Sequence, residues 1–179
     1  HLPNLPILQA LPALQEALAT RRIVLLEAPP GAGKSTVVPL ALLDAEWRGG
    51  GRILMLEPRR IAARAVAERM ATLIGEQAGQ TIGFRTRLET RVGPSTQVEV
   101  VTEGILTRML QHDPGLDGTA CVVFDEFHER SIHADLGLAL ARRVQAVFRP
   151  DLRILIMSAT LEEEAHRLAE VGREDPVHE

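Results

Sequence analysis

The sequence predicts an α/β domain in which helices cover both faces of a mainly parallel sheet. Four short runs consist of apolar residues alone, at 23–26, 53–56, 121–124 and 154–157, and stretches with helical patterning separate them. Short apolar runs that alternate with helices are typical of parallel strands buried on both faces. A chain of 179 residues with 45% apolar residues can bury one full core. We therefore expect a single α/β domain.

Proline and glycine residues divide the first half of the chain into a short helix and two strand–helix pairs. Proline and glycine fall between the patterned stretches, where they end strands and begin turns. A long helix at 60–73 is favoured by its alanine and arginine content. The expected elements are, in order, a lead-in at 2–20 with a helix at 11–18, a strand at 23–26, a helix at 37–43, a loop at 47–51, a strand at 53–56 and a helix at 60–73.

The second half begins with two stretches in which polar and apolar residues alternate, as strands require. A turn at Gly93-Pro94-Ser95 separates them. The expected elements are strands at 81–88 and 97–102, a helix at 104–111, a loop at 113–118, a strand at 121–124, a helix at 134–148 and a strand at 154–157.

The glycine-rich stretch after the first strand has the pattern of a phosphate-binding loop. It runs Glu-Ala-Pro-Pro-Gly-Ala-Gly-Lys-Ser-Thr over 27–36 and leads into a helix. Gly31 and Gly33 would let backbone N–H groups surround a phosphate, and the helix N-terminus would add attraction for an anion. Lys34 would neutralise the β- and γ-phosphates, and the Ser35 hydroxyl would bind Mg²⁺.

Two carboxylates directly follow the third apolar run. Ligands of an open parallel sheet collect at the carboxyl ends of its strands, so Asp125 and Glu126 should lie at the same edge as the phosphate loop. Asp125 is suited to hold the Mg²⁺ of a bound nucleotide. Glu126 is suited to accept a proton from the attacking water or to orient it. Polar residues at 57–60 and 158–160 should lie along this edge too.

Spacing and composition exclude several other classes of protein. His128 and His133 are five positions apart, whereas the zinc-protease pattern needs histidines four apart on a helix. The lone Cys121 excludes a disulfide within the chain and, with no signal peptide evident, favours a reducing cytoplasm. No apolar run approaches the ~18 residues needed to cross a bilayer. We expect a cytoplasmic protein with no membrane association.

Two groups of arginines are candidates for contacts with nucleic-acid phosphates. The net charge of −4 does not indicate a nucleic-acid binder, although it averages over all faces of the molecule. Solvated helix faces carry arginines routinely, so contacts with phosphates and ordinary surface exposure stay open as interpretations of these arginines. Aromatic residues are only 3%, so nucleic acid would be held by its backbone and not on a base-stacking platform. The arginines are Arg59, Arg60, Arg64 and Arg69 in one group and Arg85, Arg87 and Arg91 in the other.

Taken in order, these stretches resemble the first motor domain of a superfamily 2 helicase of the DEAH-box class, most closely the bacterial HrpB-type ATP-dependent helicases. Five motifs in sequence make the resemblance specific. Two positions depart from the pattern, because motif I opens with Ala28 in place of Gly and Phe127 stands where the class name has Ala. The matching segments are 28–36 for motif I, 57–64 for motif Ia, 102–106 for motif Ib, 125–130 for motif II and 158–160 for motif III.

The resemblance implies a RecA-like P-loop NTPase fold and NTP hydrolysis coupled to movement along single-stranded nucleic acid, with RNA favoured over DNA. The implied cofactors are ATP, or another NTP, and Mg²⁺. Phosphates would be held by Pro30, Gly31, Ala32, Gly33, Lys34, Ser35 and Thr36, the metal by Ser35 and Asp125, and catalysis would rest on Lys34, Asp125, Glu126 and His128. Nucleic acid would contact Arg59, Arg60, Thr102 and Glu103, coupling would use Ser158 and Thr160, and Arg69 would pack against the base of the nucleotide.

The resemblance also sets the expected boundaries. We expect a lead-in at 1–20, a RecA-like ATP-binding domain at 21–171 and the start of a linker at 172–179. The family's second RecA-like domain, with its arginine-rich motif VI, is absent from the sequence, and the segment between Thr160 and Gly172 is short for the family. Hydrolysis is therefore expected to need that second domain. The rival interpretation is a nucleotide-dependent switch or assembly domain that acts on a protein partner without nucleic acid.

Overall fold

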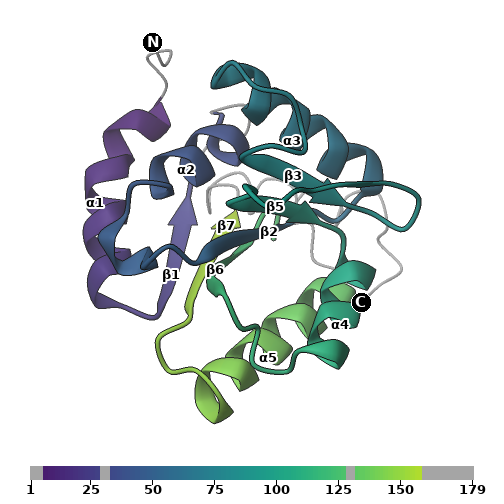
Figure 1. The fold of residues 1–179 in the computed structure, drawn as a ribbon. Coiled ribbons are helices and arrows are strands. Elements are labelled where there is room, and N and C mark those ends of the chain that lie inside the picture. Colours follow the sequence, from purple (N-terminus) through teal and green to yellow (C-terminus); the bar gives the residue numbers. More distant parts are fainter. Residues whose placement is uncertain (1–5, 29–32, 128–131, 159–179) are drawn as a thin grey trace, which may run out of the picture.

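The computed structural model describes residues 6–28, 33–127 and 132–158. Within them a seven-stranded sheet lies at the centre of the molecule, in the order β1-β7-β6-β2-β5-β3-β4 (Figure 1). Neighbouring strands are parallel, apart from the antiparallel pair β3 and β4. The strands are β1 (Ile23–Glu27), β2 (Arg52–Leu56), β3 (Ile82–Arg85), β4 (Thr90–Arg91), β5 (Val98–Val101), β6 (Thr119–Phe124) and β7 (Arg153–Ser158).

Helices cover both faces of this sheet, as the sequence predicts (Figure 1). Ile53 and Met55 of β2 pack into one core cluster with the first three helices, whereas Leu54 and Leu56 pack into a second cluster with the last two. No helix within the described residues is long and apolar enough to span a bilayer. The helices are α1 (Pro6–Thr20), α2 (Lys34–Leu42) and α3 (Arg60–Leu73) on one face, α4 (Glu103–His112) and α5 (Ile132–Val147) on the other, and the 3₁₀ turn η1 (Glu46–Arg48).

Helix α1 is longer than the predicted helix at 11–18 and belongs to the core. It begins at Pro6 and contains Pro12 within its length. Ile7, Leu14 and Leu18 are at most 4% exposed and join the first core cluster. The apolar face of α1 therefore supplies part of the packing behind the phosphate-loop helix α2.

The predicted strand at 81–88 is wrong in its second half. The chain leaves β3 at Arg85, reverses over 86–89 and returns as β4. The Thr86 N–H donates to the Glu89 carbonyl oxygen over 2.8 Å, and the Glu89 N–H donates to Thr86 Oγ1 over 3.2 Å. Because this turn contains no Gly, Pro, Asn or Asp, no turn signal marks it in the sequence. The predicted turn at 93–95 is present and leads the chain back into β5, parallel to β3.

Candidate functional site

The carboxyl ends of the parallel strands form the edge along which the predicted site residues gather. Leu56 of β2 and Phe124 of β6 are register partners at the ends of adjacent strands. Backbone bonds continue past them, since the Asp125 N–H donates to the Leu56 carbonyl oxygen over 3.1 Å. At the ends of β1 and β7, the Ala28 N–H donates to the Ser158 carbonyl oxygen over 3.1 Å. The loops that follow these strands therefore start from one row.

Ser35 and Asp125, the two predicted ligands of Mg²⁺, are in direct contact. The Ser35 hydroxyl, in the first turn of α2, donates a hydrogen bond to Asp125 Oδ2 over 2.6 Å. The other carboxylate oxygen, Oδ1, accepts the Glu126 N–H over 3.0 Å. Hydroxyl and carboxylate oxygens are ligands that Mg²⁺ prefers, so the pair fits the implied cation.

Lys34 is buried with an amine that has no protein partner. The residue is 3% exposed, and its Nζ makes no hydrogen bond within the described part of the chain. Burial of a cation without a partner is unfavourable, so such a group calls for an anionic ligand. Lys34 is also the only lysine in the sequence. The structure therefore keeps one buried ammonium group at the start of α2, where a phosphate would fit.

The start of α2 is shaped for an anion by its backbone. Gly33 is the N-cap with φ 77° and ψ 12°, a left-handed conformation that favours glycine. No side chain among the described residues caps the helix. The Thr36 hydroxyl donates to the Gly33 carbonyl oxygen over 3.2 Å and so helps to hold this turn. The predicted phosphate-loop residues Pro30, Gly31 and Ala32 lie outside the described residues.

Glu126 has an unusual backbone conformation for its residue type. Its φ is +54°, in the left-handed region that non-glycine residues rarely adopt. The turn is held from both sides, because the Glu126 N–H donates to Asp125 and the Phe127 N–H donates to the Met157 carbonyl oxygen over 3.0 Å. Strain of this kind costs of order 1–3 kcal/mol and concentrates at functional sites. His128, which follows, lies outside the described residues.

Of two further predicted residues, Ser158 lies at the edge formed by the strand ends and Arg69 lies away from it. Ser158 ends β7, beside the phosphate-loop strand β1, and is 8% exposed. Thr160 lies outside the described residues. Arg69 is exposed on α3, nine residues after the helix begins and hence about 13 Å along the helix axis from the edge. Its contact with the base of the nucleotide stays a prediction without support from this placement.

The predicted nucleic-acid contacts come together in one groove. Arg59 and Arg60 at the start of α3, together with Thr102 and Glu103 at the start of α4, line a groove of about 670 Å³. They meet because β2 and β5, the strands that precede them, are adjacent and parallel. Arg87, at the tip of the turn between β3 and β4, lines the same groove. We call this surface the motif groove.

Ion pairs brace the turn that carries Arg87. Arg64 of α3 donates from Nη1 to Glu89 over 2.9 Å and from Nε to Glu68 over 2.9 Å. Hydrogen bonding to Glu68 and the charge of Glu89 raise the pKa of the Arg64 guanidinium. Arg91 lies 3.5 Å from Glu89. Of the arginines whose role the sequence left open, Arg64, Arg85 and Arg91 thus contact a carboxylate, whereas Arg87 faces the motif groove.

Comparisons with known proteins agree with this geometry. Residues 8–168 match the DEAD/DEAH box helicase family. The ATP-dependent RNA helicase HrpB of Escherichia coli (strain K12) is 54% identical over 174 residues, which are 97% of this chain and 21% of that protein. The DExH-box ATP-dependent RNA helicase DExH3 of Arabidopsis thaliana is 38% identical over 165 residues, which are 90% of this chain and 14% of that protein.

A solved structure shows the same fold. The crystal structure of the E. coli DExH-box NTPase HrpB superposes with a TM-score of 0.85 at 53% sequence identity. The superposed part is 95% of this chain and 21% of the HrpB chain. The expected RecA-like fold is therefore confirmed. The chain spans about a fifth of the length of HrpB, 21% by sequence.

Proposed function

Because this chain belongs to the DEAD/DEAH box helicase family, we propose that it is the first RecA-like motor domain of an ATP-dependent helicase that moves on single-stranded nucleic acid, RNA in preference to DNA. The observation that carries the nucleotide part is the contact between Ser35 and Asp125 beside the buried Lys34. The motif groove carries the nucleic-acid part. We also propose that it works in the cytoplasm.

The residues at the start of α2 bind the nucleotide phosphates. The Lys34 ammonium pairs with phosphate oxygens, which gives this buried cation the partner that the described protein atoms do not supply. Gly33 and Thr36 hold the turn from which the first N–H groups of the helix face the anion. Pro30, Gly31 and Ala32 complete the loop in this proposal.

Ser35 and Asp125 hold Mg²⁺, which supplies charge neutralisation to the phosphates when it is bound. The hydrogen bond between them keeps the two oxygens adjacent before the cation arrives. Asp125 is 6% exposed, so its carboxylate is shielded from bulk water. Glu126 orients the attacking water and accepts its proton.

Hydrolysis depends on a second RecA-like domain of the same protein. An arginine from that domain would stabilise charge on the transferred phosphoryl group, and loss of such a residue costs roughly 10³–10⁵ in rate. Ser158, at the end of β7, together with His128 and Thr160, would transmit the nucleotide state to that domain and to nucleic acid. The chain on its own therefore binds Mg·ATP and hydrolyses it slowly.

The motif groove separates this proposal from the rival one, a nucleotide-dependent switch that acts on a protein partner. A switch has no need for arginines and a helix N-terminus converging on one groove, whereas a nucleic-acid backbone binds such groups through its phosphates. The helix N-terminus is that of α4, and Thr102 and Glu103 lie at its start. The groove favours the motor.

Charge reversal of Arg60 tests the nucleic-acid part. Arg60→Glu should weaken the binding of a single-stranded oligouridylate and lower the salt dependence of log K by about 0.7 per lost phosphate contact. Arg69→Glu, a change on the same helix but outside the motif groove, is the matched control. Fluorescence anisotropy at several salt concentrations measures both. Equal binding by Arg60→Glu and the unchanged chain would favour the switch.

A further inference from the structure

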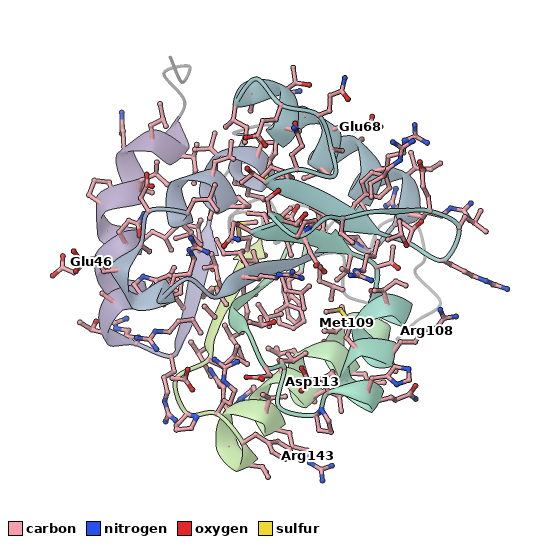
Figure 2. All side chains as sticks on the ribbon, in the orientation of Figure 1. Glu46, Glu68, Arg108, Met109, Asp113 and Arg143 are labelled. Atoms are coloured by element: carbon pink, nitrogen blue, oxygen red, sulfur yellow. The ribbon has the colours of Figure 1, made fainter. Side chains whose placement is uncertain are left out.

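A second cavity, of about 700 Å³, lies between α4 and the sheet. Leu54, Ile105 and Met109 supply apolar lining, and four arginines, Arg52, Arg85, Arg87 and Arg108, line it as well. We call it the α4 cavity. In Figure 2, Arg108, Met109 and Asp113 mark the side of the molecule on which it lies.

A buried carboxylate organises two of these arginines. Glu99 of β5 is 1% exposed, and its Oε1 accepts from Arg52 Nη1 over 2.6 Å. Its Oε2 accepts from Arg85 Nε over 3.3 Å. The arginine side chains are 42% and 38% exposed, so their outer portions stay in contact with solvent. A guanidinium group has five N–H donors, and these contacts with Glu99 use one from each arginine.

The α4 cavity is therefore suited to phosphates and not to bases. Three carboxylates also line the cavity: Glu99 is paired with two of the arginines, whereas Asp113 and Asp117 lie in the loop after α4, where Asp113 Oδ2 accepts the Asp117 N–H over 2.7 Å. Four arginines against three carboxylates give the lining a net positive charge in a chain whose net charge is −4. Among the described residues no Phe, Tyr or Trp lines it, and His112 supplies the one aromatic ring of its lining, so it lacks the set of rings that a base-stacking platform needs.

The α4 cavity is connected to the motif groove by shared elements. Arg87 lines both. Helix α4 also borders both, because its start lines the motif groove and its later turns, from Ile105 to His112, line the cavity. Arg87 and α4 therefore connect the two surfaces.

We propose that the α4 cavity is a second section of the nucleic-acid track, which holds the sugar–phosphate backbone of nucleotides that continue beyond the motif groove. This inference rests on the proposed function. Arg87 and Arg108 contact phosphates, Arg52 and Arg85 offer their outer N–H groups, and the aliphatic lining packs against ribose.

The test is the dependence of binding on oligonucleotide length. Oligouridylates from about 4 to about 14 nucleotides, within the range of single-strand site sizes, are titrated against the chain by fluorescence anisotropy. The variant is Arg108→Glu, on the exposed side of α4. The matched control is Arg143→Glu, an exposed arginine on α5 that lines neither the motif groove nor the α4 cavity (Figure 2). Thermal melts check that both variants fold.

The expected result is an effect of length. Short oligouridylates should bind Arg108→Glu and the unchanged chain equally, whereas long ones should bind the variant several-fold more weakly, with the salt dependence of log K lower by about 0.7–1. Arg143→Glu should match the unchanged chain at every length. Photocrosslinking of long oligonucleotides with terminal 4-thiouridine should label the later turns of α4, from Arg108 to His112, whereas short ones should not label these turns.

The test distinguishes failure of this inference from failure of the proposed function. If Arg60→Glu weakens binding at every length while Arg108→Glu binds like the unchanged chain, the inference is overturned and the proposed function stands. Equal weakening of short and long oligouridylates by Arg108→Glu also overturns the inference, because it indicates a general electrostatic effect. If no oligonucleotide of any length binds the unchanged chain, the inference and the nucleic-acid part of the proposed function fail together.

Discussion

Replacing Lys34 with methionine should stabilise the nucleotide-free protein while abolishing its response to nucleotide. Methionine has a similar length and no charge, so it can occupy the same buried space. The change removes a buried ammonium group that lacks a hydrogen-bond partner among the described residues. A residue that both destabilises the free protein and binds the ligand is typical of a functional site.

The expected rise in Tm follows from the burial of the Lys34 ammonium group. Lys34 is 3% exposed, and a buried donor without a partner costs about 1–3 kcal/mol, more when it is charged. For a chain of this size each 1 kcal/mol shifts Tm by roughly 2–4 °C, so Lys34→Met should raise Tm by roughly 2–12 °C. Mg·ATP at a hundred times its Kd should add about 2.7 kcal/mol to the unchanged chain and nothing to the variant.

The assay is thermal unfolding of the chain with and without Mg·ATP. Arg143→Met, which removes an exposed cation from α5, serves as the control and should change neither Tm nor the response to nucleotide. A lower Tm for Lys34→Met in the absence of nucleotide would refute the reasoning, since it would mean that the amine has a stabilising partner. A preserved response to Mg·ATP would refute the role of Lys34 in phosphate binding.

Three further predictions concern single residues. Ser35→Ala removes the 2.6 Å hydrogen bond to Asp125 and should lower the free energy of unfolding by about 1 kcal/mol. When ATP binding is titrated with Mg²⁺, this variant should need a higher Mg²⁺ concentration than the unchanged chain. An unchanged Mg²⁺ requirement would contradict the assignment of Ser35 as a metal ligand. Glu126→Gly should be more stable than Glu126→Gln by up to about 1 kcal/mol in urea denaturation, because glycine relieves the positive φ; equal stabilities would mean that the turn is not strained. Burial raises the pKa of the Cys121 thiol to about 12, so at pH 8 iodoacetamide should label it only in urea, as measured by mass spectrometry, and rapid labelling of the folded chain would contradict its burial.

The position of the candidate nucleotide site was predictable because its signals are local. A glycine-rich stretch after an apolar run marks the proposed phosphate loop, and a carboxylate after another apolar run marks the proposed metal ligand. The rule that strand ends share one edge then predicted that Ser35 and Asp125 would be close, and the structure places them in hydrogen-bond contact. The order of the strands is not local, and no pattern showed that β7 lies between β1 and β6.

Other features depend on contacts that no sequence pattern reports. The reversal at 86–89 is held by Thr86, not by a turn residue, so a continuous strand was expected there. Glu99 stands at a polar position of the alternating stretch at 97–102, where alternation alone would place it in solvent, yet it is 1% exposed. Its charge is compensated by Arg52 and Arg85 from the strands on either side, which only the assembled sheet reveals.

Release of phosphate from Mg·ATP by the 179-residue chain, with and without single-stranded RNA, tests the central claim most directly. Glu126→Gln sets the background, because the amide cannot accept a proton from water. The account predicts measurable binding of nucleotide, a rate close to this background, and a large increase in rate when a second RecA-like domain is joined to the chain. Turnover by the chain alone that is well above background and is lost in Glu126→Gln would contradict it, because the domain would then complete its own active site.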